Sequence, residues 1–368
     1  MKRLFSLLLV VCVLLTLAAC KKEPAADTTA EPTTEATDIT EVTDPPETTA
    51  VPETTAAPVV YRNPLNGEVL DEPWTGRATA VVINNIRAAL PHHGVGNADI
   101  LYEIETEGGI TRCLAVYDDL SGAGTIGPIR SARTYFSNVA VSYDAPLVHC
   151  GGSYAALNAQ YDDSGARISD WNHIDQMYNG SYFFRDTDRY KYQGYAFEHT
   201  LFTTDERLNQ ALEAKGYNIA SETDYGLQFD ENVELNGEPA AKVVATFRGG
   251  KTMTMTYNAD TGLYEASQYG SDYKDANTDQ IMSFRNVLVL YAKHWFIYDG
   301  TYDRSFYDLI GSGDGHLAIG GEIVPIKWVR ENLEDPFVYT LEDGTPVTLG
   351  VGHSYIAIVD EGRTASYE

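Results

Sequence analysis

Residues 21–60 cannot contribute to a hydrophobic core. The segment consists largely of threonine, proline, alanine and acidic residues, and no aromatic residue follows in the chain until Tyr61. It buries too little apolar surface to offset the entropy lost on ordering, and proline together with like charges keeps it extended. The sequence therefore predicts a disordered stalk, and folded structure that begins at about residue 61.

The segment before the stalk has the features of an export signal. A short basic start, Met-Lys-Arg, precedes an apolar run from Leu4 to Leu17, which is too short for a comfortable membrane span. The run closes with Leu-Ala-Ala-Cys, which resembles a bacterial lipobox. We expect a signal peptide over residues 1–19 and a lipid on Cys20; an ordinary signal peptide that ends in cysteine is the alternative. The predicted location is extracytoplasmic, lipid-anchored to the outer face of the cytoplasmic membrane.

The charge balance limits the partners of the chain. There are 53 acidic and 26 basic residues, and the formal net charge is −27. Such a chain repels the phosphate backbone of nucleic acid, so we expect no nucleic-acid partner. His92 and His93 are adjacent, with no cysteine or third histidine near them, so no metal site and no cofactor are predicted.

Patterns after residue 77 predict regular structure in two parts. In the first part we expect strands joined by a hairpin at Gly108-Gly109, and a helix over 132–142 capped by Ser131. A second helix should follow Ser153, and a third should run from Thr204 or Asp205 to Gly216. After about residue 226, β-like runs alternate with turn signals. The predicted fold class is α+β or α/β, with an α/β domain at 61–230 and a mainly β domain at 231–368.

Several short blocks carry a family resemblance. They are "NPLNG" (63–67), "IGPIRSARTYF" (126–136), "VHCGGS" (148–153), "HTLFTT" (199–204) and "GSGDGHLAIGGEIVPIKW" (311–328). In these blocks and their order the chain resembles the YerB-like lipoprotein family. The resemblance implies a two-part ectodomain of a kind found mostly in Gram-positive envelopes. It implies no particular reaction.

Two arginines in "IGPIRSARTYF" are candidates for anion binding. Arg130 and Arg133 would share a face of the opening turn of a helix, whose free backbone N–H groups favour anions. A guanidinium matches carboxylate and phosphate oxygens. A second turn and helix start follow the strand that ends at His149. The predicted ligand-binding set is Arg112, Arg130, Ser131, Arg133, His149, Gly151, Gly152 and Ser153.

The same arginines have an alternative, structural interpretation. Glu103, Glu105 and Glu107 alternate along the preceding hairpin and should project from one face. They could pair with Arg112, Arg130 and Arg133 and hold the fold together. In a mixed interpretation, these glutamates and His199 support the arginines while one guanidinium edge stays free for ligand.

Two further patterns allow a catalytic hypothesis. Gly151-x-Ser153-x-Ala155 is a degraded nucleophile elbow with His199 downstream, although a serine at a helix start is usually only a cap. The glutamate cluster could instead supply a general acid, as in glycosidases. Cys113 and Cys150 lie in strand-like runs. Two buried free thiols are one interpretation, but we predict that they occupy adjacent strands within disulfide range.

These patterns together favour a membrane-anchored binding protein. Its α/β domain would bind an anionic envelope ligand: a peptidoglycan peptide, a teichoic phosphate or a related glycan. An envelope hydrolase or transferase is the alternative, and an accessory protein that acts through a protein partner is the second. No catalytic residue is assigned, and catalysis is the less favoured interpretation.

Overall fold

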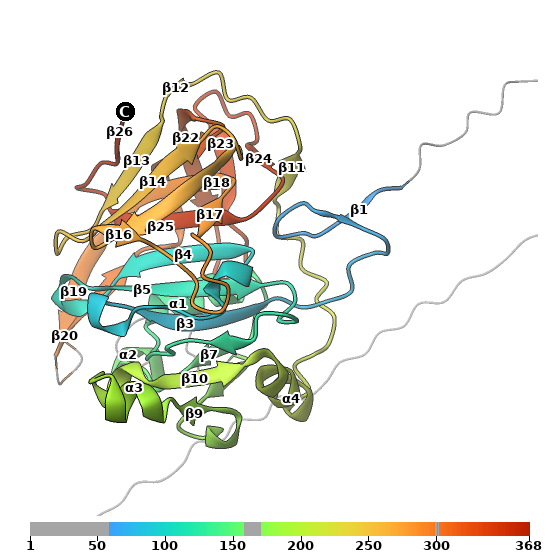
Figure 1. Cartoon of the computed structure of the whole chain (residues 1–368). Coiled ribbons are helices and arrows are strands. Elements are labelled where there is room, and N and C mark those ends of the chain that lie inside the picture. Colours follow the sequence, from blue (N-terminus) through green and yellow to red (C-terminus); the bar gives the residue numbers. More distant parts are fainter. Residues whose placement is uncertain (1–58, 158–170, 299, 301) are drawn as a thin grey trace, which may run out of the picture. The chain divides into compact units, whose positions relative to one another are not determined.

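The computed structural model describes residues 59–157, 171–298, 300 and 302–368 (Figure 1). Residues from Pro58 to Glu368 form one compact unit. The predicted signal peptide, Cys20 and nearly all of the predicted stalk lie outside the described residues. Within the described ranges, no helix is both long and apolar enough to cross a membrane.

The architecture is mostly β and is built on one eleven-stranded sheet. The strand order is β12-β22-β21-β18-β25-β4-β5-β3-β7-β8, and β23 pairs with β22 outside this path. The bounds are β12 Glu238–Pro239, β22 Glu322–Arg330, β21 Gly311–Ile319, β18 Asn286–Ala292, β25 Ser354–Asp360, β4 Ile100–Glu105, β5 Thr111–Tyr117, β3 Thr79–Asn85, β7 Leu147–His149, β8 His173–Asp175 and β23 Val338–Leu341.

A six-stranded sheet and several smaller pairings complete the strands. The six are β16 Ser271–Asp272, β15 Leu263–Gln268, β14 Thr252–Asn258, β13 Lys242–Thr246, β26 Ser366–Tyr367 and β17 Ser283–Phe284. A three-stranded sheet holds β6 Thr125–Ile126, β10 Leu201–Thr204 and β9 Phe184–Arg185. The two-stranded pairs are β1 Tyr61–Arg62 with β2 Val69–Leu70, β11 Gln228–Asp230 with β24 Thr348–Gly350, and β19 His294–Tyr298 with β20 Asp303–Tyr307.

The helices are short, and along the sequence they lie mainly among the strands of the N-terminal part. The α-helices are α1 Thr134–Ser142, α2 Tyr154–Leu157, α3 Thr187–Tyr192 and α4 Asp205–Lys215; the described 3₁₀ turns are η1 Arg87–Ala89, η2 Val95–Asn97, η3 Glu107–Gly109, η6 Gly180–Tyr182 and η7 Phe197–His199. Helix α4 has the predicted Thr204 cap and Gly216 stop. The cap predicted at Ser131 is wrong: α1 begins later, with Arg133 as its N-cap.

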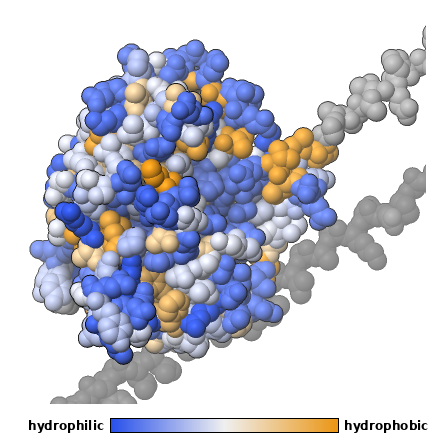
Figure 2. Space-filling model, viewed as in Figure 1, coloured by the Kyte–Doolittle hydropathy of each residue, from blue (hydrophilic) through white to orange (hydrophobic). Residues whose placement is uncertain are grey.

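The central sheet is buried on both faces, and the alternation of side chains along its strands explains how. Along β3, Val81 and Ile83 belong to one core cluster, and Val82 belongs to the other. The first cluster also holds Met253 of β14, and the second holds Tyr135 of α1. Successive side chains of a strand point to opposite faces, so one face packs on the six-stranded sheet and the other on α1. Figure 2 shows one side of the surface, which is mostly hydrophilic, with a hydrophobic patch over β1 and β2.

Strand β25 joins the two parts of the sequence. It pairs in parallel with β18 on one side and with β4 on the other. The eleven-stranded sheet therefore contains strands from both sides of residue 230. The predicted domain boundary at that residue separates two parts of the sequence that share one sheet. In the N-terminal part, β7 pairs in parallel with β3 and with β8, whereas β5 pairs antiparallel with β3 and with β4. The mainly β character expected of the C-terminal part is confirmed, whereas a purely α/β N-terminal part is not.

Glu103, in the middle of the sheet, connects four segments. Its side chain is fully buried. The carboxylate accepts hydrogen bonds from Thr111 Oγ1 at 2.5 Å and Tyr355 Oη at 2.7 Å, and from the Asn85 amide at 2.8 Å. Lys251 Nζ, next to β14, completes an ion pair with it. These donors satisfy a charge that would otherwise be too costly to bury.

Removing Lys251 should therefore destabilise the fold strongly. In a Lys251→Met variant the Glu103 carboxylate stays buried without its cation, and loss of one partner of a buried pair costs about 3–5 kcal/mol. Urea unfolding measures the difference. The matched control is Lys242→Met, because the Lys242–Glu368 pair is exposed on both sides and such pairs contribute about 0–1 kcal/mol. Equal effects of the two variants would show that the buried pair is not important for stability.

Candidate functional site

The three hairpin glutamates do not act together on the arginines. Glu103 and Glu105 share the face that packs on the six-stranded sheet, and Glu105 accepts a hydrogen bond from the backbone N–H of Arg248. Burial raises the pKa of Glu105 despite this bond. Glu107 lies beyond the strand end, in η3, and alone among the three contacts Arg133. The expectation that all three glutamates pair with the arginines is therefore wrong for Glu103 and Glu105.

Arg133 is part of a buried ion pair. Its Nη2 and Nε lie 2.6 and 2.8 Å from the two carboxylate oxygens of Glu107, and its Nη1 donates to the Ala132 carbonyl at 2.8 Å. Burial alone would raise the pKa of Glu107, but the hydrogen bonds and charge of Arg133 outweigh it, and the pKa lies below its usual value. Arg133 therefore helps to hold α1 against the hairpin, as the structural interpretation predicts.

Arg112 also points inward. It is buried, and one nitrogen of its guanidinium donates to the Ser131 carbonyl. Burial and then the charge of Arg133 lower the pKa of Arg112 well below its usual range. Its contact with Ser131 fixes the backbone that leads into α1. Ser131 thus contributes its carbonyl oxygen to the fold, where a side-chain cap was expected.

Arg130 differs from the other two arginines because it lies at the surface. Its backbone links β3 and β7: its N–H donates to Val82, and its carbonyl accepts from Cys150. Its side chain is 28% exposed and pairs with Glu198, with 2.5 Å between Nη2 and Oε2. The pair is open to solvent because the Glu198 side chain is 51% exposed.

Arg185, which the sequence analysis missed, is a neighbour of Arg130. The charge of Arg130 is among the causes that lower the pKa of Arg185, after burial. Arg185 donates to the Phe197 carbonyl at 2.7 Å, and its guanidinium lies 4.1 Å from the centre of the Phe197 ring. In the part of the chain that the structure describes, it has no carboxylate at ion-pair distance. Tyr190 packs edge-on against the same Phe197 ring, with 5.6 Å between ring centres.

His149 and the turn after it form a closed hydrogen-bond network. His149 is fully buried; its Nδ1 lies 2.8 Å from the Gly151 carbonyl, and its Nε2 lies 3.1 Å from Nδ1 of His173. Asp175 accepts from the Gly151 N–H at 2.8 Å. Burial lowers the pKa of His149 to about 4, against the opposing charge of Asp175. His149 is therefore a neutral, internal group that does not face a surface ligand.

The remaining predicted residues near this turn have local partners. Gly152 forms a β-bridge with Ala132. Ser153 is buried, and its hydroxyl accepts from the N–H of Ala156, so it caps α2 as predicted from its position. His199 contacts the Asn84 amide through Nδ1 at 2.9 Å. No hydrogen bond joins Ser153 to a histidine within the described residues, so the hydrolase hypothesis gains no support here.

The cysteines do not form the expected bridge. Cys113 lies in β5 and Cys150 follows β7, and β3 runs between these two strands. Both are free thiols. The prediction that they occupy adjacent strands is wrong because the chain inserts β3, which pairs with β5 on one side and β7 on the other. Burial raises the pKa of both thiols.

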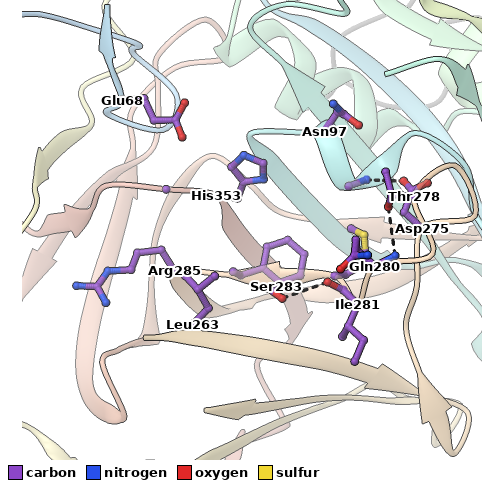
Figure 3. Close-up of a pocket in the computed structure, with 14 residues that line it drawn as sticks. Glu68, Asn97, Leu263, Asp275, Thr278, Gln280, Ile281, Ser283, Arg285 and His353 are labelled. Carbon is purple, nitrogen blue, oxygen red and sulfur yellow. Dashed lines mark hydrogen bonds between the residues drawn. The ribbon is translucent and has the colours of Figure 1, made fainter. Parts of the chain in front are cut away.

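A separate cavity lies at the N-terminal ends of the parallel strands β4, β25 and β18. Its volume is about 520 Å³, and its wall includes Glu68, Asn97, Arg285 and His353 (Figure 3). In Figure 3 the His353 ring lies between Glu68 and the apolar side of the cavity. Burial lowers the pKa of His353, against the opposing charges of Glu68 and Asp118.

The "NPLNG" loop builds one wall of this cavity. Asn66 donates to Asp99 at 2.6 Å, and Asn63 donates to Asp118 at 2.7 Å. The Asn66 carbonyl accepts from the N–H of Gly352, the residue before His353. The loop thus carries Glu68 and fixes the His353 segment at the same time.

Asp99 and Asp118 are two carboxyl groups in contact with each other. Burial and then the charge of Asp99 raise the pKa of Asp118 to about 7. Burial also raises the pKa of Asp99. Two like charges in one buried site favour a shared proton, so the pair keeps a proton at pH values at which isolated aspartates are ionised.

Comparison with known proteins places the chain in a family. It matches the models described as "Protein of unknown function (DUF3048) N-terminal domain" over residues 65–218 and "Protein of unknown function (DUF3048) C-terminal domain" over residues 243–356, and it belongs to this family. It is 31% identical over 308 residues to "Putative lipoprotein YerB" of Bacillus subtilis (strain 168), a match that spans 82% of this chain and 87% of the relative. The crystal structure of YerB from Bacillus subtilis matches with a TM-score of 0.68 and 27% identity, over 83% of this chain and 99% of that one. The YerB-like resemblance is confirmed.

The raised pKa of Asp118 predicts a pH effect on stability. The folded protein binds this proton more tightly than the unfolded chain, whose aspartates have a pKa of about 3.9. The contribution is thus complete below about pH 4, and the free energy of unfolding should fall as pH rises from about 4 to about 7. In an Asp118→Asn variant, the free energy of unfolding should fall less over this pH range. Urea unfolding at several pH values measures the difference. Asp71→Asn, at an exposed position whose charge is not among the causes of the Asp118 shift, is the control; a D118N curve parallel to it contradicts the assignment.

Proposed function

We propose that the protein is an extracytoplasmic lipoprotein, anchored by a lipid on Cys20. The apolar run that ends in Leu-Ala-Ala-Cys supports the anchor, and so does the name of the relative, a putative lipoprotein. The threonine- and proline-rich segment that follows would hold the folded part away from the membrane surface.

The anchor has a direct test. A Cys20→Ala variant should no longer incorporate a radiolabelled fatty acid, and it should leave the membrane fraction of expressing cells. A Cys12→Ala variant is the matched control, because Cys12 lies within the predicted signal peptide. Unchanged labelling of the Cys20 variant would contradict the lipobox.

We further propose that the folded part binds an anionic glycan of the cell envelope at the surface of Arg130 and Arg185. The observation that carries this proposal is the juxtaposition of two accessible guanidiniums: within the described residues Arg130 pairs with one carboxylate, that of Glu198, and Arg185 pairs with none. A chain with a net charge of −27 offers many acids that could have neutralised them. A phosphate or carboxylate could bind both guanidiniums through paired N–H donors.

Aromatic side chains on the same surface support a sugar-containing ligand. Phe197 is 54% exposed and Tyr190 is 50% exposed. Phe197 already receives Arg185 on its ring, so an anionic group at the arginine would bring the adjacent sugar toward exposed aromatic surface. A teichoic polymer combines sugar or polyol units with phosphates, and is the envelope ligand class that this surface fits best.

Binding of poly(glycerol phosphate) teichoic acid to the full-length protein in detergent tests the site. Arg130→Gln and Arg185→Gln should each weaken binding about tenfold, since a charge-assisted hydrogen bond contributes about 1.5–3 kcal/mol. Glu198→Gln should strengthen binding, because it removes the carboxylate that competes for Arg130. Calorimetric titration gives the dissociation constants, and Arg87→Gln, at an exposed position on η1, is the control.

Arg133 separates binding from folding in the same experiment. Arg133→Lys should lower the unfolding midpoint, because Lys cannot reproduce the forked contact with Glu107. Its folded fraction should bind the polymer like the unaltered protein. If R130Q and R185Q bind as tightly as R87Q, the anion site is wrong and the lipid anchor is unaffected.

A further inference from the structure

The cavity of Figure 3 has a polar side and an apolar side. Glu68, Asn97 and His353 contribute polar groups, and Leu263 and Phe284 contribute apolar surface. A volume of about 520 Å³ lies in the range of small-molecule sites, which combine apolar walls with a few polar groups. The cavity shares no residue with the Arg130 and Arg185 surface.

Three charged residues line this cavity: Glu68, Asp275 and Arg285. Asp275 accepts hydrogen bonds from the backbone N–H groups of Gly94 and Gly96, whereas Glu68 and Arg285 do not neutralise each other. Arg285 donates to the Gly262 carbonyl at 3.1 Å, and Glu68 uses only its backbone in hydrogen bonds. Neither forms an ion pair with the other or with any other residue in the described ranges. A ligand with a positive group at one end and a negative group at the other would pair with both Glu68 and Arg285.

The positions of both charged residues are fixed by the surrounding backbone. A Cβ atom at Gly350 would lie 2.5 Å from Nε of Arg285, and one at Gly352 would lie 3.0 Å from its Cβ. The two glycines therefore leave the space that the arginine fills. On the other side, Asn63 and Asn66 clamp the loop that presents Glu68. The backbone that carries Glu68 and the space that Arg285 fills are thus set before a ligand binds, which lowers the entropic cost of binding.

We propose that this cavity binds a short peptide or amino acid with a free ammonium group, a free carboxylate and an apolar side chain. Glu68 would receive the ammonium group and Arg285 the carboxylate. Leu263 and Phe284 would cover the side chain. His353, neutral at physiological pH because of its burial, would exchange a hydrogen bond with the ligand's peptide group.

The test uses alanyl-leucine and two modified forms, its N-acetyl derivative and its C-terminal amide. Titration calorimetry with the full-length protein in detergent should show binding of the unmodified dipeptide. Acetylation and amidation should each weaken that binding about tenfold, because each removes one charge-assisted contact. Alanyl-aspartate should bind more weakly than alanyl-leucine, since its side chain is charged.

Two variants link each end of the peptide to one residue. Glu68→Gln should bind the dipeptide about tenfold more weakly and should no longer distinguish it from its acetylated form. Arg285→Met should likewise lose the distinction between acid and amide. Because Arg285 packs between glycines, R285M could unfold. The titrations of the Glu68→Gln variant then test the proposal by themselves, since Glu68 is exposed and its replacement should not disturb folding. Glu72→Gln, another exposed site, is the matched control.

Three results would overturn the proposal. The first is that the unmodified dipeptide does not bind. The second is that the acetylated and amidated forms bind as tightly as the unmodified one. The third is that E68Q keeps the discrimination shown by E72Q. None of these results bears on the teichoic-acid titration, because that ligand is polyanionic and its site uses Arg130 and Arg185.

Discussion

The buried carboxylate of Glu103 is the interaction on which the central sheet depends. Its partners come from β3, β5, β25 and the residue before β14, so the N-terminal and C-terminal parts must both be in place before the charge is satisfied. An incompletely assembled sheet would leave a charge in an apolar core, which costs several kcal/mol. This couples assembly of the two sequence regions, and it explains why β25 can lie between β18 and β4 in a single compact unit.

Local structure was predictable where the signal was local. The hairpin of β4 and β5 follows from alternating residues around Gly108-Gly109, and α4 follows from Thr204 and Gly216. The predicted start of α1 failed because tertiary pairing prevailed over capping propensity. Residues before the helix are extended: Ile129 bridges to Ile83, and Ala132 bridges to Gly152. This pairing delays the start of α1 until Thr134, so Ser131 lies two residues before the N-cap position that Arg133 occupies.

The same extended segment explains why only part of the candidate site was predicted. On a helix, Arg130 and Arg133 would share a face, but on an extended chain an odd spacing directs them to opposite sides. Arg133 therefore reaches Glu107 inside, and Arg130 reaches Glu198 outside. Arg185 lies over fifty positions further along the chain, and no local pattern connects it to Arg130. The cavity of Figure 3 depends equally on distant segments, although its "NPLNG" loop was visible as a family motif.

The strongly acidic net charge has different consequences for the two proposed ligands. At physiological ionic strength, interactions between exposed charges are screened beyond about 8 Å. Arg130 and Arg185 therefore attract little more of a polymer than the single phosphate that they contact. A longer polyanion also meets the acidic surface around them, and its affinity reflects local attraction minus that repulsion. A zwitterion carries no net charge, so the overall field acts on it weakly. Discrimination in the cavity therefore rests on the placement of Glu68, whose backbone N–H Asn66 holds, and of Arg285, whose space the two glycines provide.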